Sequence, residues 1–214
     1  MKILITGFDA FNGEKINPAS LILEGLADEI DGHEIEKLLL PTAFYKVASM
    51  LEERIEKYQP DIIISLGQAG GRSDITVERV AINIADASIA DNDGKTPIDE
   101  KIREDGENAY FATLPIKAIV ENLREAKIPA AVSNTAGTFV CNYVMYTDLY
   151  LAQKNKNISA GFIHVPFLPA QVLDKRGMAS MSLDDMLRAV EIIIKTSISY
   201  KDKKDLEKAE GRIC

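Results

Sequence analysis

Asp61-Ile62-Ile63-Ile64-Ser65-Leu66 is an almost continuous apolar run of strand length. A strand without polar alternation is typical of a parallel sheet that is covered on both faces. Two more apolar runs precede it, at residues 2–6 and 34–40, and Gly7 and Pro41 end them. The three runs therefore predict buried strands of one sheet.

Helix patterns separate these runs. Asn17-Pro18 joins a good N-cap residue to a residue suited to the first helical turn, and apolar residues at helical spacing follow as far as Ile30. A second helix is expected over residues 43–57. The alternation predicts an α/β fold, a three-layer α/β/α sandwich whose mostly parallel, twisted sheet has helices on both faces.

The rest of the chain is expected to complete a single domain, residues 1–214. The patterns predict an extended segment at 75–84, an acidic excursion at 85–107, a short strand at 110–113, a helix at 115–126, a strand at 129–132, a helix ending near 155, a strand at 158–165 and a last helix from Ser182 to about 200. The charged tail, residues 201–214, is expected to fray or to end a helix.

Composition limits the partners. The chain has 33 acidic and 25 basic residues, a net charge of −8, which argues against nucleic acid or an anionic membrane as the main partner. The two cysteines, Cys141 and Cys214, make no disulfide framework and favour a reducing cytoplasm. The N-terminal apolar run is too short for a signal peptide or a membrane span. No Cys/His cluster has the spacing of a metal site, and no cofactor is expected.

A candidate nucleophile lies in Ser133-Asn134-Thr135-Ala136-Gly137-Thr138-Phe139-Val140-Cys141-Asn142. A helix pattern begins near Phe139, with Thr138 as the expected N-cap. Cys141 then lies in the first helical turn, where free N–H groups and the helix dipole stabilise a thiolate and could hold an oxyanion. The alternative is a buried structural cysteine.

Two further residues suit acyl transfer. His164 ends a strongly apolar run, where parallel sheets place their chemistry, whereas His33 lies in a polar turn and is expected to be solvated. Glu78 interrupts the segment at 75–84 and either orients another group or forms a solvent-facing or salt-bridged pair with Arg79. A thiol, a base and an orienting carboxylate suffice for acyl transfer through a thiolate, although His164 could instead be a hydrogen-bonded core residue.

Four segments carry a resemblance to a known family. They are Gly7-Phe8-Asp9-Ala10-Phe11 with Asn17-Pro18, residues 67–83, residues 133–142, and His164-Val165-Pro166-Phe167. Over residues 2 to about 194 the chain resembles the pyrrolidone-carboxylate peptidases (pyroglutamyl peptidase I), a family of cysteine peptidases. The resemblance implies removal of an N-terminal pyroglutamyl residue from peptides, with Cys141 as nucleophile, His164 as general base and Glu78 as the acidic member of the triad. It also implies a homotetramer.

A pocket for pyroglutamate should have apolar walls and few hydrogen-bonding groups, because the group is a small, neutral lactam. By resemblance, Phe8 and Phe11 are expected to form the walls, and Asn17 and Gln68 the polar contacts. Plain core packing is the alternative for the two phenylalanines. In the implied reaction, His164 either takes the Cys141 proton during attack or rests with Cys141 as an ion pair.

The sequence departs from the family pattern at several positions. Ser88 stands where the family commonly has Arg, Ala10 where it has Pro, and Tyr143 where it has His. Ala90 stands where the family often has Pro. Loss of a cation at position 88 motivates a second hypothesis, a weakly active or inactive relative that binds a pyroglutamyl-like ligand. A nucleoside- or phosphate-binding protein is a third, but the Gly-rich loop at 67–72 lacks the Gly-x-Gly-x-x-Gly spacing.

Overall fold

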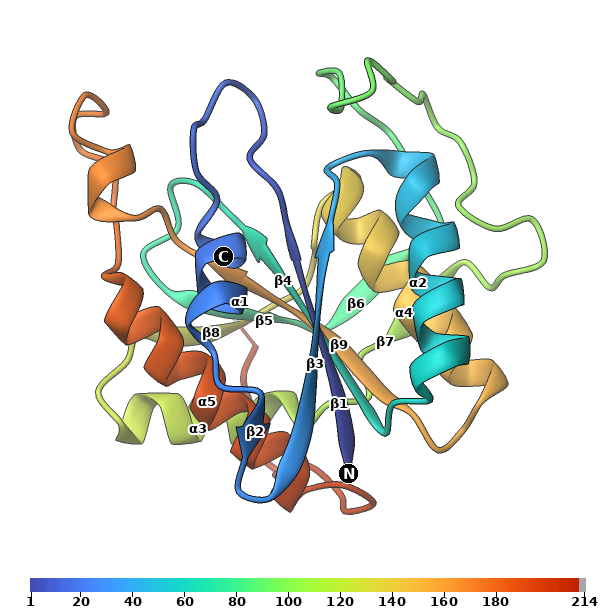
Figure 1. Ribbon diagram of the computed structural model, residues 1–214, viewed down its shortest axis with the longest axis vertical. Coiled ribbons are helices and arrows are strands. Elements are labelled where there is room, and N and C mark those ends of the chain that lie inside the picture. The colour runs from blue at the N-terminus through green and yellow to red at the C-terminus, as the bar shows by residue number, and fades with distance from the viewer. Residues whose placement is uncertain (212–214) are drawn as a thin grey trace.

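The computed structural model describes residues 1–211, and Cys214 lies outside the described residues. Its main sheet has seven strands in the order β2-β3-β1-β4-β9-β5-β8, and β6 and β7 form a small second sheet (Figure 1). The strands are β1 (Lys2–Phe8), β2 (Glu29–Ile30), β3 (His33–Leu40), β4 (Ile62–Gln68), β5 (Ile75–Glu78), β6 (Val80–Ile82), β7 (Ala109–Phe111), β8 (Ala130–Ser133) and β9 (Ser159–Val165). The helices are α1 (Pro18–Gly25), α2 (Phe44–Tyr58), α3 (Ile116–Glu125), α4 (Val140–Lys154), α5 (Leu183–Ser199) and the short 3-10 helix η1 (Pro169–Gln171).

The predicted three-layer α/β/α sandwich is confirmed. Helices α1, α3 and α5 cover one face of the sheet, and α2 and α4 cover the other (Figure 1). The apolar run of β4 serves both layers, because Ile62 and Ile64 pack on the first side and Ile63 on the second, all three with no exposed surface. This double burial explains why the run has no polar alternation.

Most strand pairs are parallel, as predicted. β1 pairs in parallel with β3 and β4, β4 with β9, and β5 with β8. Two pairs are antiparallel: β2 with β3 at one end of the sheet, and β5 with β9, which sets Thr76 opposite His164. The extended segment at 75–84 is therefore divided, with β5 in the main sheet and β6 in the small one.

The ends of β1 and α1 differ from the sequence predictions. β1 continues through Gly7 to Phe8, and a Cβ at Gly7 would lie 3.0 Å from the Ala19 carbonyl oxygen, so the glycine allows α1 to pack closely. α1 begins at Pro18 with Asn17 as its N-cap, as predicted, but it ends at Gly25, and Ile30 belongs to β2. The segment between them is extended, because Leu26 leaves the helical conformation.

Carboxylates distant in sequence cap two helices that lack a side-chain N-cap of their own. Asp91, from the excursion at 85–107, accepts the Phe44 N–H at 2.9 Å at the start of α2. Asp205, from the tail, accepts the N–H groups of Lys117 and Ala118 at 2.9 and 3.0 Å at the start of α3. A turn at 201–203 follows the end of α5, and the tail beyond it brings a carboxylate to first-turn donors of another helix.

Within residues 1–211, no helix combines the length and the apolar character that crossing a membrane requires.

The helix that carries Cys141 also contains a fully buried acid. Asp148 of α4 has no exposed surface, and its Oδ2 accepts the Ser65 hydroxyl at 2.6 Å, while Ser65 in turn accepts from Thr6 at 2.7 Å. Its Oδ1 has no hydrogen-bond partner in the described part of the chain. Burial raises the pKa of the Asp148 carboxyl to about 7, and the Ser65 hydrogen bond opposes this rise only partly.

We expect Asp148→Asn to change how stability depends on pH. A carboxyl with a raised pKa in the folded state destabilises the fold as pH rises from its ordinary value, 3.8, through about 7. The variant has no such charge, so it should be more stable than the wild type above neutral pH, by on the order of 2–4 kcal/mol, and equal to it near pH 4. Urea unfolding across this pH range measures the difference. Parallel curves for the two proteins would contradict the prediction.

Candidate active site

The thiol of Cys141 rests against a strand position that only glycine can occupy. Cys141 is the second residue of α4, in the first helical turn as predicted, although the N-cap residue is Phe139 and not Thr138. A Cβ at Gly67 would lie 3.0 Å from the Cys141 Sγ and 2.8 Å from the Phe162 ring. Real Cβ atoms rarely approach so closely, so glycine at the end of β4 makes room for the thiol.

His164 lies beside that position. In the ladder between β4 and β9, Gly67 is the direct partner of His164, so the Sγ lies over the strand position next to the imidazole. His164 is buried, and its ring packs against Phe162 with the ring centres 4.9 Å apart. Its Nδ1 contacts the Glu78 Oε1 at 2.7 Å. Since Nδ1–H donates to that carboxylate, Nε2 is the nitrogen left to accept a proton.

Glu78 is a fully buried carboxylate, not a solvent-facing one. It has no exposed surface, and its partner is Arg72, whose Nη1 lies 2.7 Å from the same Oε1, rather than Arg79. The other oxygen, Oε2, has no hydrogen-bond partner within residues 1–211. His33 lies directly after the turn, as the first residue of β3; it is half-buried, and its Nδ1 contacts the chain's amino group at 2.9 Å, so it is not simply solvated.

Burial sets the charge state of this group. Burial raises the pKa of the Glu78 carboxyl, but the hydrogen bond and charge of His164, with smaller contributions from Ser133 and Arg72, outweigh it and hold that pKa below its ordinary value. Burial also lowers the pKa of His164, although Glu78 acts in the opposite direction. Glu78 is therefore ionised and His164 is neutral at neutral pH.

The thiol itself is protonated at rest. Burial raises the pKa of the Cys141 thiol to about 12, and the charge of Glu78 adds to this rise, while Arg72 and the Cys141 N–H oppose it. The first-turn N–H of Cys141 favours the thiolate, as expected, but desolvation and the charge of Glu78 outweigh it. The directions of these pKa shifts favour the neutral thiol and imidazole over the resting ion pair.

A small cavity adjoins the thiol. It has a volume of about 100 Å³ and is lined by Phe8, Phe11, Glu14, Ile16, Asn17, Thr42, Gln68, Phe139 and Cys141. The four residues that the sequence assigned to a pocket all line it. Phe139, which the sequence analysis did not assign to the pocket, packs against Phe11 with the ring centres 5.0 Å apart. Its place two residues before Cys141, at the start of the helix, was the available signal.

The polar residues of the cavity differ in what they can offer. Asn17 is committed to structure, because its Oδ1 accepts the Ala19 N–H at 3.0 Å and its Nδ2 donates to the Asp9 carbonyl at 2.9 Å. Gln68 accepts from Gln171 through Oε1 at 2.8 Å, and its Nε2 has no protein partner among residues 1–211. Gln171, a buried residue of η1, fixes the Gln68 amide, and no local sequence signal pointed to it.

The departures from the family pattern lie outside this lining. Ser88 is exposed, in a loop joined to the turn before α4 by the Asp86 N–H, which donates to the Thr138 carbonyl at 3.0 Å. The Ala10 carbonyl accepts from Asn92 at 3.0 Å, which ties its loop to the excursion. Tyr143 is buried and packs edge-on against Phe44 of α2.

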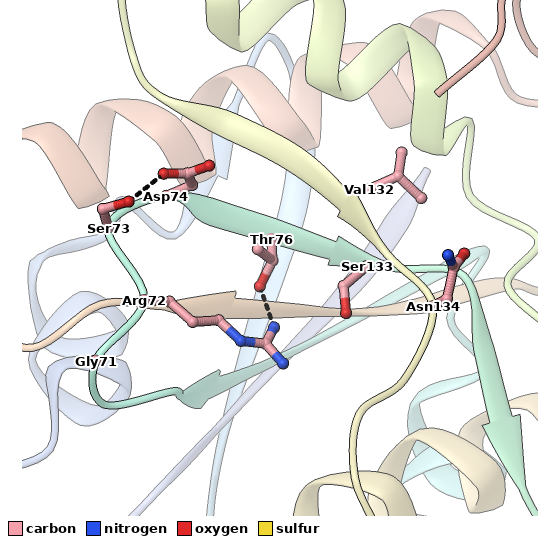
Figure 2. Close-up of a pocket in the computed structure, with 8 residues that line it drawn as sticks. All are labelled: Gly71, Arg72, Ser73, Asp74, Thr76, Val132, Ser133 and Asn134. Carbon is pink, nitrogen blue, oxygen red and sulfur yellow. Dashed lines mark hydrogen bonds between the residues drawn. The ribbon is translucent and has the colours of Figure 1, made fainter. Parts of the chain in front are cut away.

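A larger cavity lies on the other side of Glu78. It has a volume of about 380 Å³ and is lined by Gly71, Arg72, Ser73, Asp74, Thr76, Val132, Ser133 and Asn134 (Figure 2). Figure 2 shows the Arg72 side chain extending from its loop toward Thr76 of β5, with the dashed line marking the bond between the two. No residue of this cavity belongs to the lining beside Cys141.

Comparisons with known proteins agree with this geometry. The model of the family described as pyroglutamyl peptidase matches residues 1–200. A pyrrolidone-carboxylate peptidase of Streptococcus suis is 55% identical over 212 residues, which cover 99% of each chain. The solved pyroglutamyl peptidase I of Bacillus amyloliquefaciens superposes with a TM-score of 0.93 at 45% identity, over 97% of this chain and 99% of that one. The solved pyrrolidone carboxyl peptidase of Thermococcus litoralis superposes with a TM-score of 0.94 at 42% identity, again over 97% of this chain and 99% of that one. This chain belongs to the pyroglutamyl peptidase family.

Proposed function

We propose that the chain removes an N-terminal pyroglutamyl residue from peptides, with Cys141 as nucleophile, His164 as general base and Glu78 as the carboxylate that orients His164. One observation carries the assignment of roles. The Cys141 Sγ lies over Gly67, the ladder partner of His164, and the His164 Nδ1 contacts a buried Glu78. The nucleophile, the base and the orienting group thus lie next to one another in that order, as thiol acyl transfer requires.

The neutral resting state indicates how the thiol is activated. The Cys141 proton passes to the His164 Nε2 as the sulfur attacks the pyroglutamyl carbonyl, and the charge of Glu78 stabilises the imidazolium that forms. First-turn N–H groups of α4, which have no intrahelical acceptor, can hold the oxyanion. The imidazolium then protonates the leaving amine, and a water molecule, deprotonated by His164, hydrolyses the thioester and restores the thiol.

The cavity beside Cys141 suits the acyl group of this reaction. Phe8, Phe11 and Phe139 give it the aromatic walls that a flat, neutral lactam requires. The free Nε2 of Gln68 can donate to the lactam carbonyl, and its orientation is fixed through Gln171. Asn17 contributes by shaping the cavity, since both ends of its amide are bonded to the backbone.

The two competing hypotheses have no support. The family model and the relative from Streptococcus suis are both named as peptidases, which gives the ligand-binding hypothesis no support. Membership of the pyroglutamyl peptidase family replaces the phosphate-binding hypothesis.

We also infer that residues 1–214 act as one domain, in a homotetramer, in the cytoplasm, without a cofactor. The resemblance to the family supports the tetramer, and the low cysteine content supports the compartment. Light scattering of the purified protein tests the assembly, and the mass of a monomer would exclude it.

We expect Cys141→Ala to abolish hydrolysis of a pyroglutamyl-coumarin amide, by at least about 10⁴-fold, because no other group can form the acyl-enzyme. His164→Ala should reduce kcat by about 10³-fold, as expected for loss of a general base. The chain offers matched controls, since Cys214→Ala and His33→Ala alter its other cysteine and histidine. Both controls should retain wild-type turnover under reducing conditions. Activity that survives in Cys141→Ala would refute the assignment.

The pH dependence should reflect the neutral pair. Activity requires unprotonated His164, whose pKa lies below its ordinary value of 6.5, so kcat/KM should fall only as pH drops below 6.5. Thiolate absorbance in the ultraviolet, taken as the difference between wild type and Cys141→Ser, should be absent at neutral pH because burial raises the thiol pKa to about 12. A thiolate signal that persists into acidic solution would indicate a resting ion pair instead.

Gln68→Met should weaken substrate binding more than it slows the chemical step. The variant keeps the length of the side chain but removes the free amide donor, so KM should rise about tenfold with little change in kcat. Steady-state kinetics with the coumarin amide measures both constants. An unchanged KM would show that this amide does not contact the lactam.

A further inference from the structure

Arg72 approaches Glu78 from a loop that turns back over the sheet. The loop follows β4, and within it the Arg72 N–H donates to the Ala69 carbonyl at 3.3 Å. Gly71 has a φ of +88°, a conformation that glycine adopts without strain. This turn directs the Arg72 side chain toward the carboxyl end of β5 (Figure 2).

The guanidinium makes two bonds on β5. Its Nη1 lies 2.5 Å from the Thr76 Oγ1 and 2.7 Å from the Glu78 Oε1. The His164 Nδ1 lies 2.7 Å from that same oxygen. One carboxylate oxygen therefore accepts both from the imidazole and from the cation, while Thr76, which is opposite His164 in the ladder, tethers the cation.

A carboxylate without exposed surface is stable only when it is paired. The groups that face Glu78 are His164 on β9, Cys141 on α4, the Ser133 hydroxyl on β8 and Arg72. His164 and Cys141 are both neutral at rest, and Ser133 has no charge. Arg72 is therefore the permanent charge among these neighbours, since arginine does not lose its proton in proteins.

We propose that Arg72 is a positioning residue that keeps Glu78 ionised and its Oε1 directed at His164. The inference rests on the proposed function, because it assigns to Glu78 the role of orienting the base. Arg72 acts through Glu78 and need not touch the substrate.

The charge of Arg72 also reaches the other two members of the site. The Arg72 hydrogen bond lowers the pKa of Glu78, next to the larger effects of His164 and Ser133, and the Arg72 charge lowers the pKa values of His164 and Cys141. Removal of this charge should therefore raise all three. On the acid side, Glu78 would take up a proton at a higher pH, and His164 would lose both its orientation and the charge that stabilises its imidazolium.

The cavity of about 380 Å³ gives the proposal a direct test. Arg72 lines it, and about a third of the Arg72 side chain is exposed there. If the side chain is shortened to alanine, a small cation from solution can enter through this cavity and reach Glu78. Free guanidinium should then replace the missing group.

The first experiment compares pH profiles. Arg72→Gln should lower kcat at least about tenfold below neutral pH, with KM within about twofold, and should move the acid limb upward by about one pH unit, as loss of an opposite charge predicts. Thr76→Val keeps the shape of the side chain but removes the hydroxyl that holds Arg72. It should move the acid limb of the pH profile upward as well, by less than Arg72→Gln does. Arg54→Gln is the control, because Arg54 is about as exposed as Arg72 and also pairs with a glutamate, Glu36, away from the site. It should leave the profile unchanged.

The second experiment is chemical rescue of Arg72→Ala. Guanidinium chloride at millimolar concentration should restore at least about a tenth of the lost kcat, whereas potassium chloride at equal ionic strength should restore none. Thermal unfolding of each variant identifies any that fail to fold, and Thr76→Val then carries the test. A folded Arg72 variant with a wild-type pH profile and no response to guanidinium would overturn the proposal.

A third measurement needs no turnover and so separates the two hypotheses. The chain has two histidines, so a His33→Ala background leaves a single imidazole N–H resonance, that of His164, for proton NMR. As the pH is lowered, the resonance of the hydrogen-bonded Nδ1–H should disappear at a higher pH in Arg72→Gln than in the background protein. If this shift is observed but the wild-type protein does not hydrolyse the coumarin amide, the positioning role of Arg72 is supported and the proposed function is refuted. The same resonance behaviour in both proteins would refute the role of Arg72 alone.

Discussion

The antiparallel pairing of β5 with β9 is the constraint on which the site depends. Every other pair that these two strands make in the sheet is parallel. In a wholly parallel sheet, Glu78 at the end of β5 would lie at the same edge as the end of β9, next to residues beyond Val165. The antiparallel register places Thr76 opposite His164 and brings the Glu78 carboxylate to the Nδ1 of the imidazole. The short length of β5 then lets the chain leave the sheet directly after Glu78.

Burial of the triad determines its chemistry. Gly67 lets the thiol lie on the sheet, and Phe162 packs beside both the thiol and the imidazole. In a buried site, each ionisable group favours its neutral form unless its partners outweigh the cost of burying its charge. The partners of Glu78 do so, whereas burial outweighs the partners of His164 and Cys141. The proton therefore remains on sulfur until an electrophile arrives, so the separation of charge is confined to the reaction itself.

Local pattern was sufficient to predict the layers and the candidate residues. Doubly buried strands such as β4 have a distinctive apolar run, α1 begins at the predicted Asn17-Pro18, and Cys141 and His164 stand where helix starts and strand ends could be recognised. Partners brought together by the fold could not be predicted in this way. Nothing in the sequence shows that Glu78 pairs with Arg72 and not with its neighbour Arg79. Likewise, nothing near α3 indicates that Asp205 caps that helix. The charge of the thiol was left open for the same reason, since burial, which raises the thiol pKa, is a property of the assembled site.

The capping of α3 by Asp205 makes the chain's end part of a mechanical connection to the site. The tail carboxylate fixes the first turn of α3, α3 packs beside β8, and β8 pairs with β5 so that Ser133 lies opposite Glu78. A fusion partner that displaces the tail, or a protease that removes it, would loosen α3 and with it β8, the strand next to the one that carries Glu78. An affinity tag is therefore better joined through a spacer that leaves Asp205 and Glu210 seated, because Glu210 holds the same helix through Arg124.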